Sequence, residues 1–477
     1  MTTRFQQAGT IAGTLLAIFI LLKGPPSDFS PEAWKAVAIT ALMGVWWCTE
    51  AVPLAVTSLI PLAAFPLMGV SPIGDVAASY VTPAFFLLFA GMLLALGMER
   101  WNIHRRVALS ILARSGRKPA GAIRAFMLAS FLLSMWISNT AITLMMLPSA
   151  ISVAAVVAPD WETNADHRRF TVAMLLGVCY ATTIGGVCTL VGTPPNLLLA
   201  GYMEQTQGIE LTFAFWMTYG LPLSLLMLPL AWWTLTRVSF PFELKNPPEA
   251  MEHLREELAK LGAFTTAEKR TIGILLTVAC CWIFRSLLNR IPGLEGLSDT
   301  GIAVTGAIVL FATPSGDGSR LLNAEWARKA PWEVMIMYGG ALALASAVAR
   351  SGLAEPLGTR LSFAAGWPVF AMMALVAVFV LAITELAQNS AALATSLPIL
   401  TALASQAGVD LQLLAIPATM AASYAFMLPV ATPPNTILYG TGMVTTGEMA
   451  RAGVWLNTAG LVSIPVVAWT VLVLLAP

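Results

Sequence analysis

Two short polar motifs interrupt long apolar stretches of the chain, and each is centred on an asparagine. The first is Ser138-Asn139-Thr140, and the second is Gln388-Asn389-Ser390, 250 positions later. An asparagine amide can donate hydrogen bonds to a carboxylate through its nitrogen, while its oxygen accepts hydrogen bonds or coordinates a cation. The flanking hydroxyl groups add further donors and acceptors. The pattern therefore predicts two halves of a site that binds a small anion together with a cation.

A second pair of motifs combines threonine with two prolines. Gly192-Thr193-Pro194-Pro195-Asn196 matches Ala431-Thr432-Pro433-Pro434-Asn435 at an offset of 239. Proline has no N–H to donate and forces the preceding residue out of helical geometry. Each motif therefore predicts a helix broken within the membrane. The break exposes N-terminal N–H groups that attract anions and C-terminal carbonyls that coordinate cations.

The charge content of these motifs indicates how an anion would be held. None of the four contains Arg or Lys, so helix dipoles and co-bound cations would have to neutralise the anion. One Ser-Asn-Thr motif alone is more often a contact between helices, and one Pro-Pro is usually a kink. Because both occur twice at matching offsets, we favour a functional site and cation-coupled transport.

The composition indicates a membrane protein. Of 477 residues, 57% are hydrophobic and 11% are charged, and the mean hydropathy is +0.77. Soluble proteins carry about 25% charged residues, so this chain predicts a helical bundle embedded in lipid. The net charge of +1 gives no indication of nucleic-acid binding. The apolar segment at 8–22 is expected to be an uncleaved first transmembrane helix.

The polar motifs at 138–140 and 388–390 are expected at the tips of re-entrant hairpins. The segment 125–159 has no formal charge and is flanked by basic residues on both sides, so the positive-inside rule places both flanks in the cytoplasm. The segment 361–409 has Glu385 as its only charge, and its nearest flanking charges, Arg360 and Asp410, show no basic excess, so the second hairpin is expected to enter from the outer side. Irregular backbone at membrane depth is tolerated where it is buried in protein or lines a cavity.

The three pairs of landmarks occur in the same order in both halves. Besides the motifs above, Phe89-Ala90-Gly91 matches Tyr338-Gly339-Gly340 at an offset of 249. Counting spans from a cytoplasmic N-terminus gives the two halves opposite orientations, which is typical of transporters built from inverted repeats. We therefore expect an all-α polytopic membrane protein.

The repeat predicts the organisation of the chain. Residues 1–81 form N-terminal scaffold helices, and 82–238 form the first repeat, with a hairpin at 119–157 and a broken helix at 168–205. Residues 239–266 form a cytoplasmic amphipathic linker, and 267–330 form scaffold helices of the second repeat. Residues 331–477 complete that repeat, with a hairpin at 366–407, a broken helix at 410–443 and a last helix at 452–476.

Enzymatic chemistry is the alternative from a different class. Glu50 and Glu385 are the acids expected inside the membrane, where ionisable residues are functional candidates, although either could instead cap a helix or form a structural pair. The three histidines lie in charged loops, and the five cysteines lie in apolar runs without metal-ligand spacing. We therefore expect no enzyme.

Several of these motifs resemble the divalent anion/sodium symporter family, which includes di- and tricarboxylate transporters. The resemblance rests on the sequence from Trp136 to Ala141, on Thr384-Glu385 followed by Gln388-Asn389-Ser390-Ala391, on the paired Thr-Pro-Pro-Asn motifs, and on the early run from Trp46 to Pro53. It covers essentially the whole chain. It implies eleven transmembrane helices and two hairpins, a homodimer, and an elevator mechanism with scaffold and transport domains.

The resemblance also implies ligand sites. A first sodium ion would bind Ser134, Ser138, Asn139 and the carbonyl of Gly192. A second would bind Thr384, Asn389 and the carbonyls of Ala387 and Ala431. A dicarboxylate would lie between the hairpin tips, with these residues around it: Ser138, Asn139, Thr140, Thr193, Pro194, Gln388, Asn389, Ser390, Thr432 and Pro433.

One residue departs from the family pattern, because Gln388 stands where the second motif usually has serine. We expect sodium-coupled import of C4-dicarboxylates such as succinate, malate or fumarate, with Na⁺ as the co-transported ion and the inner cell membrane as the location. The alternatives are a sodium-independent dicarboxylate exchanger and a tricarboxylate or sulfate symporter.

Overall fold

The computed structural model describes residues 4–114, 118–244, 258–353 and 366–475, together with Glu256 and Pro356. Throughout these residues the ordered elements are helices, apart from one isolated bridge between Pro314 and Arg320. Eight of the described helices are long and apolar enough to cross a membrane. The expected all-α polytopic fold is therefore confirmed, while the count of eleven transmembrane helices and the elevator mechanism remain predictions.

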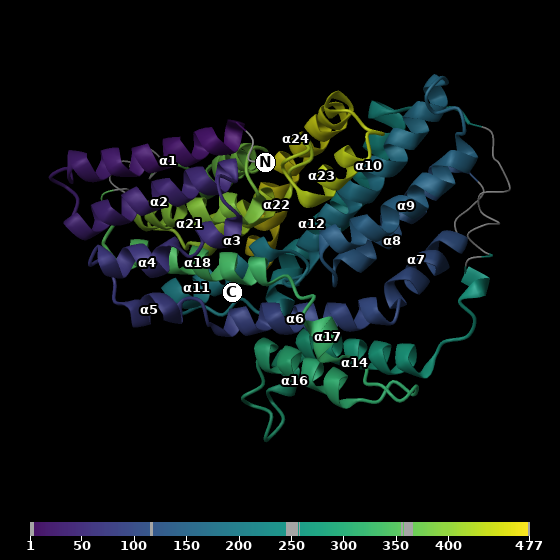
Figure 1. Ribbon diagram of the computed structural model, residues 1–477, viewed down its shortest axis with the longest axis horizontal. Helices are drawn as coiled ribbons and strands as arrows, with labels where there is room; N and C mark the ends of the chain where they lie inside the picture. Colours follow the sequence, from purple (N-terminus) through teal and green to yellow (C-terminus); the bar gives the residue numbers. More distant parts are fainter. Residues whose placement is uncertain are drawn as a thin grey trace.

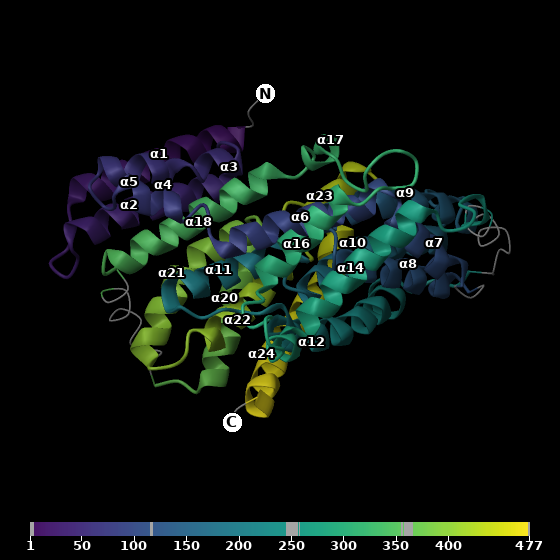
Figure 2. The ribbon, with the colours of Figure 1, turned by 90° about the horizontal axis from the view of Figure 1, so that it is seen from below.

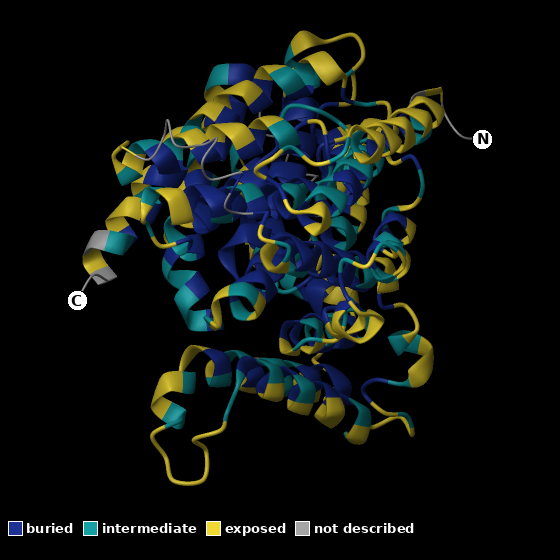
Figure 3. Cartoon of the chain, turned by 90° about the vertical axis from the view of Figure 1, so that its left-hand side faces the viewer, coloured by how far each residue is buried: buried dark blue, intermediate teal, exposed yellow. Residues whose placement is uncertain are grey.

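The N-terminal helices α1–α5 lie at one end of the molecule, and α7–α9 lie at the other (Figures 1 and 2). Helix α1 is largely exposed, as the yellow helix beside the N-terminus in Figure 3 shows, which is typical of a helix that faces lipid. The bounds are α1 (Arg4–Lys23), α2 (Pro31–Thr49), α3 (Leu54–Thr57), α4 (Ile60–Leu67), α5 (Ile73–Ala78), α6 (Pro83–Arg100) and α7 (Ile103–Ala113).

Two short helices, α3 and α4, lie within the expected N-terminal scaffold segment 1–81, where an apolar run could have formed one continuous helix. Pro61 is the second residue of α4, and Ser58 and Leu59 separate the two helices. Because proline cannot donate a backbone hydrogen bond, it fits the first turn of a new helix better than the interior of a continuous one.

The two hairpins have matching dimensions. The first consists of α8 (Pro119–Ser134) and α9 (Asn139–Val157), and the second of α20 (Val369–Thr384) and α21 (Asn389–Ala407). In each, a 16-residue helix leads into a four-residue tip and a 19-residue helix returns. Pro148 and Pro398 occupy the same position in α9 and α21, so the repeat is preserved in detail.

Two interrupted helices lie at the centre of the bundle. The first consists of α10 (Ala165–Cys188) and α11 (Pro194–Gln207), and the second of α22 (Gln412–Ser423) and α23 (Pro433–Gly440). Every residue of α10 from Phe170 to Cys188 is buried. Helix α10 packs against α8 and α9, and α22 packs against α20 and α21, so each hairpin lies beside the broken helix of its own half.

The remaining helices surround this centre. Helices α14 and α16 pack on α6 and form a layer along the lower edge of the molecule in Figure 1, while α12 packs on α10 and α24. The bounds are α12 (Phe213–Trp233), the π-helix η1 (Thr234–Ser239), α14 (Thr266–Ile283), α15 (Arg285–Leu288), α16 (Asp299–Ala312), α17 (Ala324–Ala327), α18 (Trp332–Arg350) and α24 (Thr446–Leu475).

The last helix begins earlier than expected, and the expected linker lies partly outside the described residues. Helix α24 begins at Thr446 rather than at 452, because Thr445 and Glu448 bond reciprocally to each other's backbone N–H and cap the additional turn. Much of the expected amphipathic linker at 239–266 lies outside the described residues, since 245–255 and 257 are not among them. The division into scaffold and transport domains remains a prediction.

Candidate functional site: two asparagine clusters beside broken helices

The first cluster joins the tip of the first hairpin to α10. Ser134, at the end of α8, donates its hydroxyl proton to Oδ1 of Asn139, at the start of α9. The amide of Asn139 lies directly on Gly186, where a Cβ atom would come within 2.5 Å of Oδ1. A Cβ atom on Gly192 would come within 2.5 Å of the carbonyl oxygen of Gly186. The structure thus brings together three of the four residues expected at the first cation site.

The second cluster has the same plan around Asn389. Oδ1 of Asn389 faces only oxygen atoms: Oγ1 of Thr384 at 3.0 Å, the carbonyl of Ala422 at 3.1 Å and the carbonyl of Ala431 at 3.1 Å. The hydroxyl of Thr384 also donates to Ala422 O at 2.7 Å. Turning the amide would let Nδ2 donate to all three oxygens instead. With Oδ1 inward, four oxygens converge, and a cation between them would satisfy the arrangement.

The chemistry of these clusters fits a weakly bound alkali cation. The ligands available are amide, hydroxyl and carbonyl oxygens, without a carboxylate, at points where helices end and their carbonyls lack partners. Ala422 O was not anticipated from the sequence. It became a candidate ligand only because α22 ends at Ser423 and leaves this carbonyl unpaired within the helix.

The last residue of each Thr-Pro-Pro-Asn motif holds the break open. Nδ2 of Asn196 donates to the carbonyls of Gly186 and Thr189, and Nδ2 of Asn435 donates to the carbonyls of Ala425 and Leu428. Both side chains are fully buried. In the sequence these asparagines are recognisable only as part of a motif. In the structure each fixes the backbone at the break of its own helix.

Glu385 braces the longer break of the second half. Its carboxylate accepts from the backbone N–H groups of Phe426, Met427 and Leu428 at 3.0–3.1 Å, and from Nδ2 of Asn457. These N–H groups have no helix to bond within, because residues 424–432 separate α22 from α23. Glu385 is therefore a positioning residue that links the hairpin tip to the break.

Glu50 has a different environment from Glu385. It ends α2 with a positive φ of 46°, and its backbone N–H bonds to Trp46 O, while its side chain is exposed. Of the two acids that the sequence marked as candidates, only Glu385 therefore lies at the site, and the structure favours a capping role for Glu50.

A small cavity is lined by residues of both halves of the chain. Pro194 from the first break and Ser390 from the second hairpin line it together, which brings residues of both halves to one place. Trp47 of α2 and Tyr338 of α18 also line this cavity. The sequence did not identify these two aromatic residues as part of the site, because their motifs were interpreted only as landmarks.

The N-terminus of α21 has the features of an anion site. Gln388 occupies the capping position without capping the helix, and its Oε1 is buried without a hydrogen-bond partner among the described residues. Helix N-termini carry unpaired N–H groups and a positive end of the dipole. Helices α9, α11, α21 and α23 all begin at a tip or a break, so four such ends are grouped in the two hairpin–helix pairs.

The other predicted residues have more local contacts. Ser138 and Thr432 cap α9 and α23 by accepting from Ala141 N and Asn435 N. Thr193 and Ala387 are buried, Thr140 is half-buried, and Pro433 is exposed. Their predicted contacts with sodium or substrate stay predictions.

Gly186 yields a test of the first cluster. Gly186→Ala should lower sodium affinity severalfold or more, because its Cβ would displace the Asn139 amide. Sodium activation of transport measures this effect. Gly273→Ala in α14 is the matched control, since no atom lies within 4 Å of the added Cβ. Equal sodium activation in both variants would show that the contact between the Asn139 amide and Gly186 does not matter for sodium binding.

The fold and the paired site define a secondary transporter built from an inverted repeat. The chain belongs to the sodium:sulfate symporter family, whose transmembrane-region model matches residues 6–475. It is 37% identical over 473 residues to a sodium-dependent dicarboxylate transporter, SdcS, of Staphylococcus saprophyticus, covering 97% of this chain and 91% of that protein. The Staphylococcus aureus SdcS proteins are 36% identical over 474 residues, covering 98% and 91%. The family resemblance seen in the sequence is thereby confirmed.

A solved structure supports the fold independently. The crystal structure of the Alcanivorax borkumensis YdaH transporter, described as having an unusual topology, matches with a TM-score of 0.58 over 98% of this chain and 99% of that chain. Because the sequences are only 14% identical, this likeness concerns the architecture alone.

Proposed function

We propose that this protein imports C4-dicarboxylates such as succinate, malate or fumarate together with sodium ions. The observation that carries the proposal is the Asn389 cluster, in which one side-chain amide lies 3.0–3.1 Å from Thr384 Oγ1 and from the carbonyls of Ala422 and Ala431. A sodium ion at that point would be coordinated by these oxygens together with Oδ1 of Asn389, and it would place positive charge beside the N-terminus of α21. The sodium-dependent dicarboxylate transporters that are 36–37% identical to the chain support the same substrate class.

The absence of a fixed cation explains why transport would be coupled. No Arg or Lys lies in the hairpin segments 125–159 and 366–407 or in the breaks. A doubly charged anion in this apolar setting would be held by helix ends and bound sodium, since an uncompensated charge at membrane depth is costly. The anion and the cations would therefore bind together or hardly at all.

Uptake of labelled succinate into proteoliposomes tests the proposal. We expect uptake with a sodium gradient and competition by malate and fumarate. Uptake that requires dicarboxylate inside the vesicles and ignores sodium would favour the exchanger. Preference for citrate or sulfate would favour the other two alternatives within the family.

Gln388 is proposed to set the size limit of the substrate. Its Oε1 is buried and has no hydrogen-bond partner within the described part of the chain. The residue stands at the start of α21, where Nε2 could donate to a carboxylate. Gln388→Ser should weaken succinate binding severalfold, because a neutral hydrogen bond contributes about 0.5–1.5 kcal/mol. It should also improve competition by citrate, which needs more room. An unchanged citrate inhibition profile would show that Gln388 only packs.

The assembly and orientation belong to the same proposal. The family resemblance predicts a homodimer, and the basic flanks of the first hairpin predict a cytoplasmic N-terminus in the inner membrane. Light scattering of the detergent-solubilised protein would test the dimer. Thiol labelling of a cysteine at His167 from each side of the membrane would test the orientation, with labelling from the cytoplasmic side expected.

A further inference from the structure

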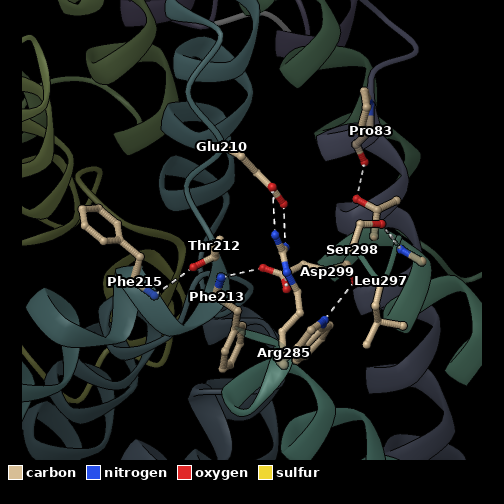
Figure 4. A network of polar contacts seen from close by, with 12 residues as sticks. Pro83, Glu210, Thr212, Phe213, Phe215, Arg285, Leu297, Ser298 and Asp299 are labelled. Atoms are coloured by element: carbon tan, nitrogen blue, oxygen red, sulfur yellow. Dashed lines mark hydrogen bonds and ion pairs between the residues drawn. The ribbon is translucent and has the colours of Figure 1, made fainter. Parts of the chain in front are cut away.

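A polar cluster connects two loops that are distant in sequence (Figure 4). Arg285 bonds to both oxygens of Glu210, at 2.6 and 2.8 Å, and its Nη1 lies 3.0 Å from Oδ1 of Asp299. The other oxygen of Asp299 accepts from the backbone N–H of Phe213 at 2.6 Å. One guanidinium thus lies between two carboxylates, one from the α11–α12 loop and one from the start of α16.

The two sides of this cluster belong to different packing groups. Arg285 and Asp299 follow and begin α14 and α16, which pack on each other and on α6. Glu210 and Phe213 precede and begin α12, which packs on α10 and α24. Helix α12 contacts α14 much less extensively than it contacts α10. The cluster is therefore a concentrated polar contact across a thin interface.

An aromatic stack continues from the cluster to the first hairpin. The ring of Phe213 stacks on Trp282 of α14 at a centroid distance of 4.7 Å and on Trp136 at 6.1 Å. Trp136 lies in the hairpin tip, two residues before Ser138. The indole of Trp282 in turn donates to the backbone oxygen of Asp299 at 2.9 Å. The aromatic stack thus connects this interface to the hairpin tip beside the first asparagine cluster. A movement at the interface would therefore be transmitted to that tip.

The three charged side chains differ in burial, and the difference would allow Glu210 to separate from Arg285 and Asp299. Asp299 is 4% exposed and Arg285 14%, whereas Glu210 is 53% exposed. If the α11–α12 loop moves away, Glu210 passes into water at little cost, while Arg285 and Asp299 still neutralise each other. No buried charge is left alone, which would otherwise be strongly unfavourable.

We propose that the Glu210–Arg285 ion pair is a latch that closes in one end state of the transport cycle and opens in each cycle as α12 moves relative to α14 and α16. The latch rests on the proposed transport function. Hydrogen bonds from Arg285 lower the pKa of the Glu210 carboxyl, so Glu210 is ionised across the neutral range in the state in which the latch is closed.

Cross-linking tests whether the two loops must separate. The variant combines Glu210→Cys, Arg285→Cys and Asp299→Asn, the last to avoid leaving a buried charge, with Cys48, Cys280 and Cys281 replaced by serine. A bifunctional, reducible thiol reagent should lower sodium-driven succinate uptake by roughly tenfold or more, because a conformational step is blocked. A reducing agent should restore uptake, and sodium-dependent succinate binding should persist throughout.

The matched control is a second bidentate Arg–Glu pair. Arg168 and Glu448 bond at 2.9 and 3.0 Å and lie on α10 and α24, which both pack on α12. Cross-linking Arg168→Cys with Glu448→Cys should leave uptake unchanged. Undiminished uptake after cross-linking of the 210–285 pair would overturn the latch. Absence of sodium-driven uptake in the unsubstituted protein would contradict the proposed function instead, and this measurement comes first.

A single substitution keeps the test decisive if the triple variant does not fold. Glu210→Cys, on the same cysteine-depleted background, retains the Arg285–Asp299 pair. Modification with a negatively charged thiol reagent should restore attraction to Arg285, and a positively charged reagent should repel it. The latch predicts severalfold different uptake rates at unchanged succinate affinity, and equal rates for the two reagents would refute it.

Discussion

Replacing Asn389 with alanine is expected to abolish or severely impair sodium-dependent succinate uptake. The amide of Asn389 lies 3.0–3.1 Å from Thr384 Oγ1 and from the carbonyls of Ala422 and Ala431, so its loss removes the atom on which the three oxygens converge. Losing a buried polar partner costs about 1–3 kcal/mol and more beside a charge. Since about 1.4 kcal/mol is a tenfold change in affinity, the expected loss is from several-fold to over a hundred-fold for each ligand.

Sodium and succinate affinity should fall together in this variant. Coupling between two ligands is reciprocal at equilibrium, and the proposed site uses one amide for both. Asn139→Ala, in the equivalent cluster of the first hairpin, is expected to behave in the same way. Asn323→Ala is the control, because this asparagine caps the short helix α17 outside the site. Normal sodium-dependent uptake by either hairpin variant would exclude its cluster from the coupling mechanism.

Glu385→Ala is expected to impair both transport and folding stability severely. Three backbone N–H groups and the Asn457 amide bond to this carboxylate. Alanine would remove this acceptor from all four donors and leave Phe426 N–H with Oδ1 of Asn457 alone. Hydrogen bonds to charged groups contribute about 1.5–3 kcal/mol each. The thermal midpoint of unfolding and the sodium activation curve measure the two effects.

The matched substitutions separate positioning from general damage. Glu385→Gln should retain more activity than Glu385→Ala, because its oxygen can still accept while its amide nitrogen opposes one of the N–H donors. Glu50→Ala should be close to wild type, since the Glu50 side chain is exposed. A Glu385→Ala protein with normal stability and normal sodium activation would show that the break does not depend on this carboxylate.

Much of the fold could be predicted from the sequence because membrane helices can be recognised from short segments of it. Apolar length, basic flanks and repeated motifs each lie within a short segment, and they predicted hairpin tips at 138–140 and 388–390. The structure places the tips slightly earlier, at 135–138 and 385–388, because Asn139 and Asn389 already begin the returning helices. The asparagines at the start of α9 and α21 were identified by the same repetition. The all-helical architecture and the family followed from the sequence, while the domain division and the ligand contacts remain predictions.

The partners of individual side chains could not be predicted in this way. Glu385 bonds to N–H groups 41–43 positions away, and only the folded chain shows that the break at 424–432 needs an acceptor. Nothing in the sequence distinguishes Gly186 from other helical glycines, and only the folded chain places the Asn139 amide against it. Arg285 begins α15 and Asp299 begins α16, and their approach depends on the packing of α14 against α16.

Accumulation of succinate against its own gradient tests the central claim most directly. Proteoliposomes with equal succinate on both sides and more sodium outside should concentrate succinate inside, and a sodium ionophore should abolish the accumulation. Equal sodium on both sides should give exchange without accumulation. Succinate that only equilibrates, at a rate independent of the sodium gradient, would contradict sodium-coupled symport.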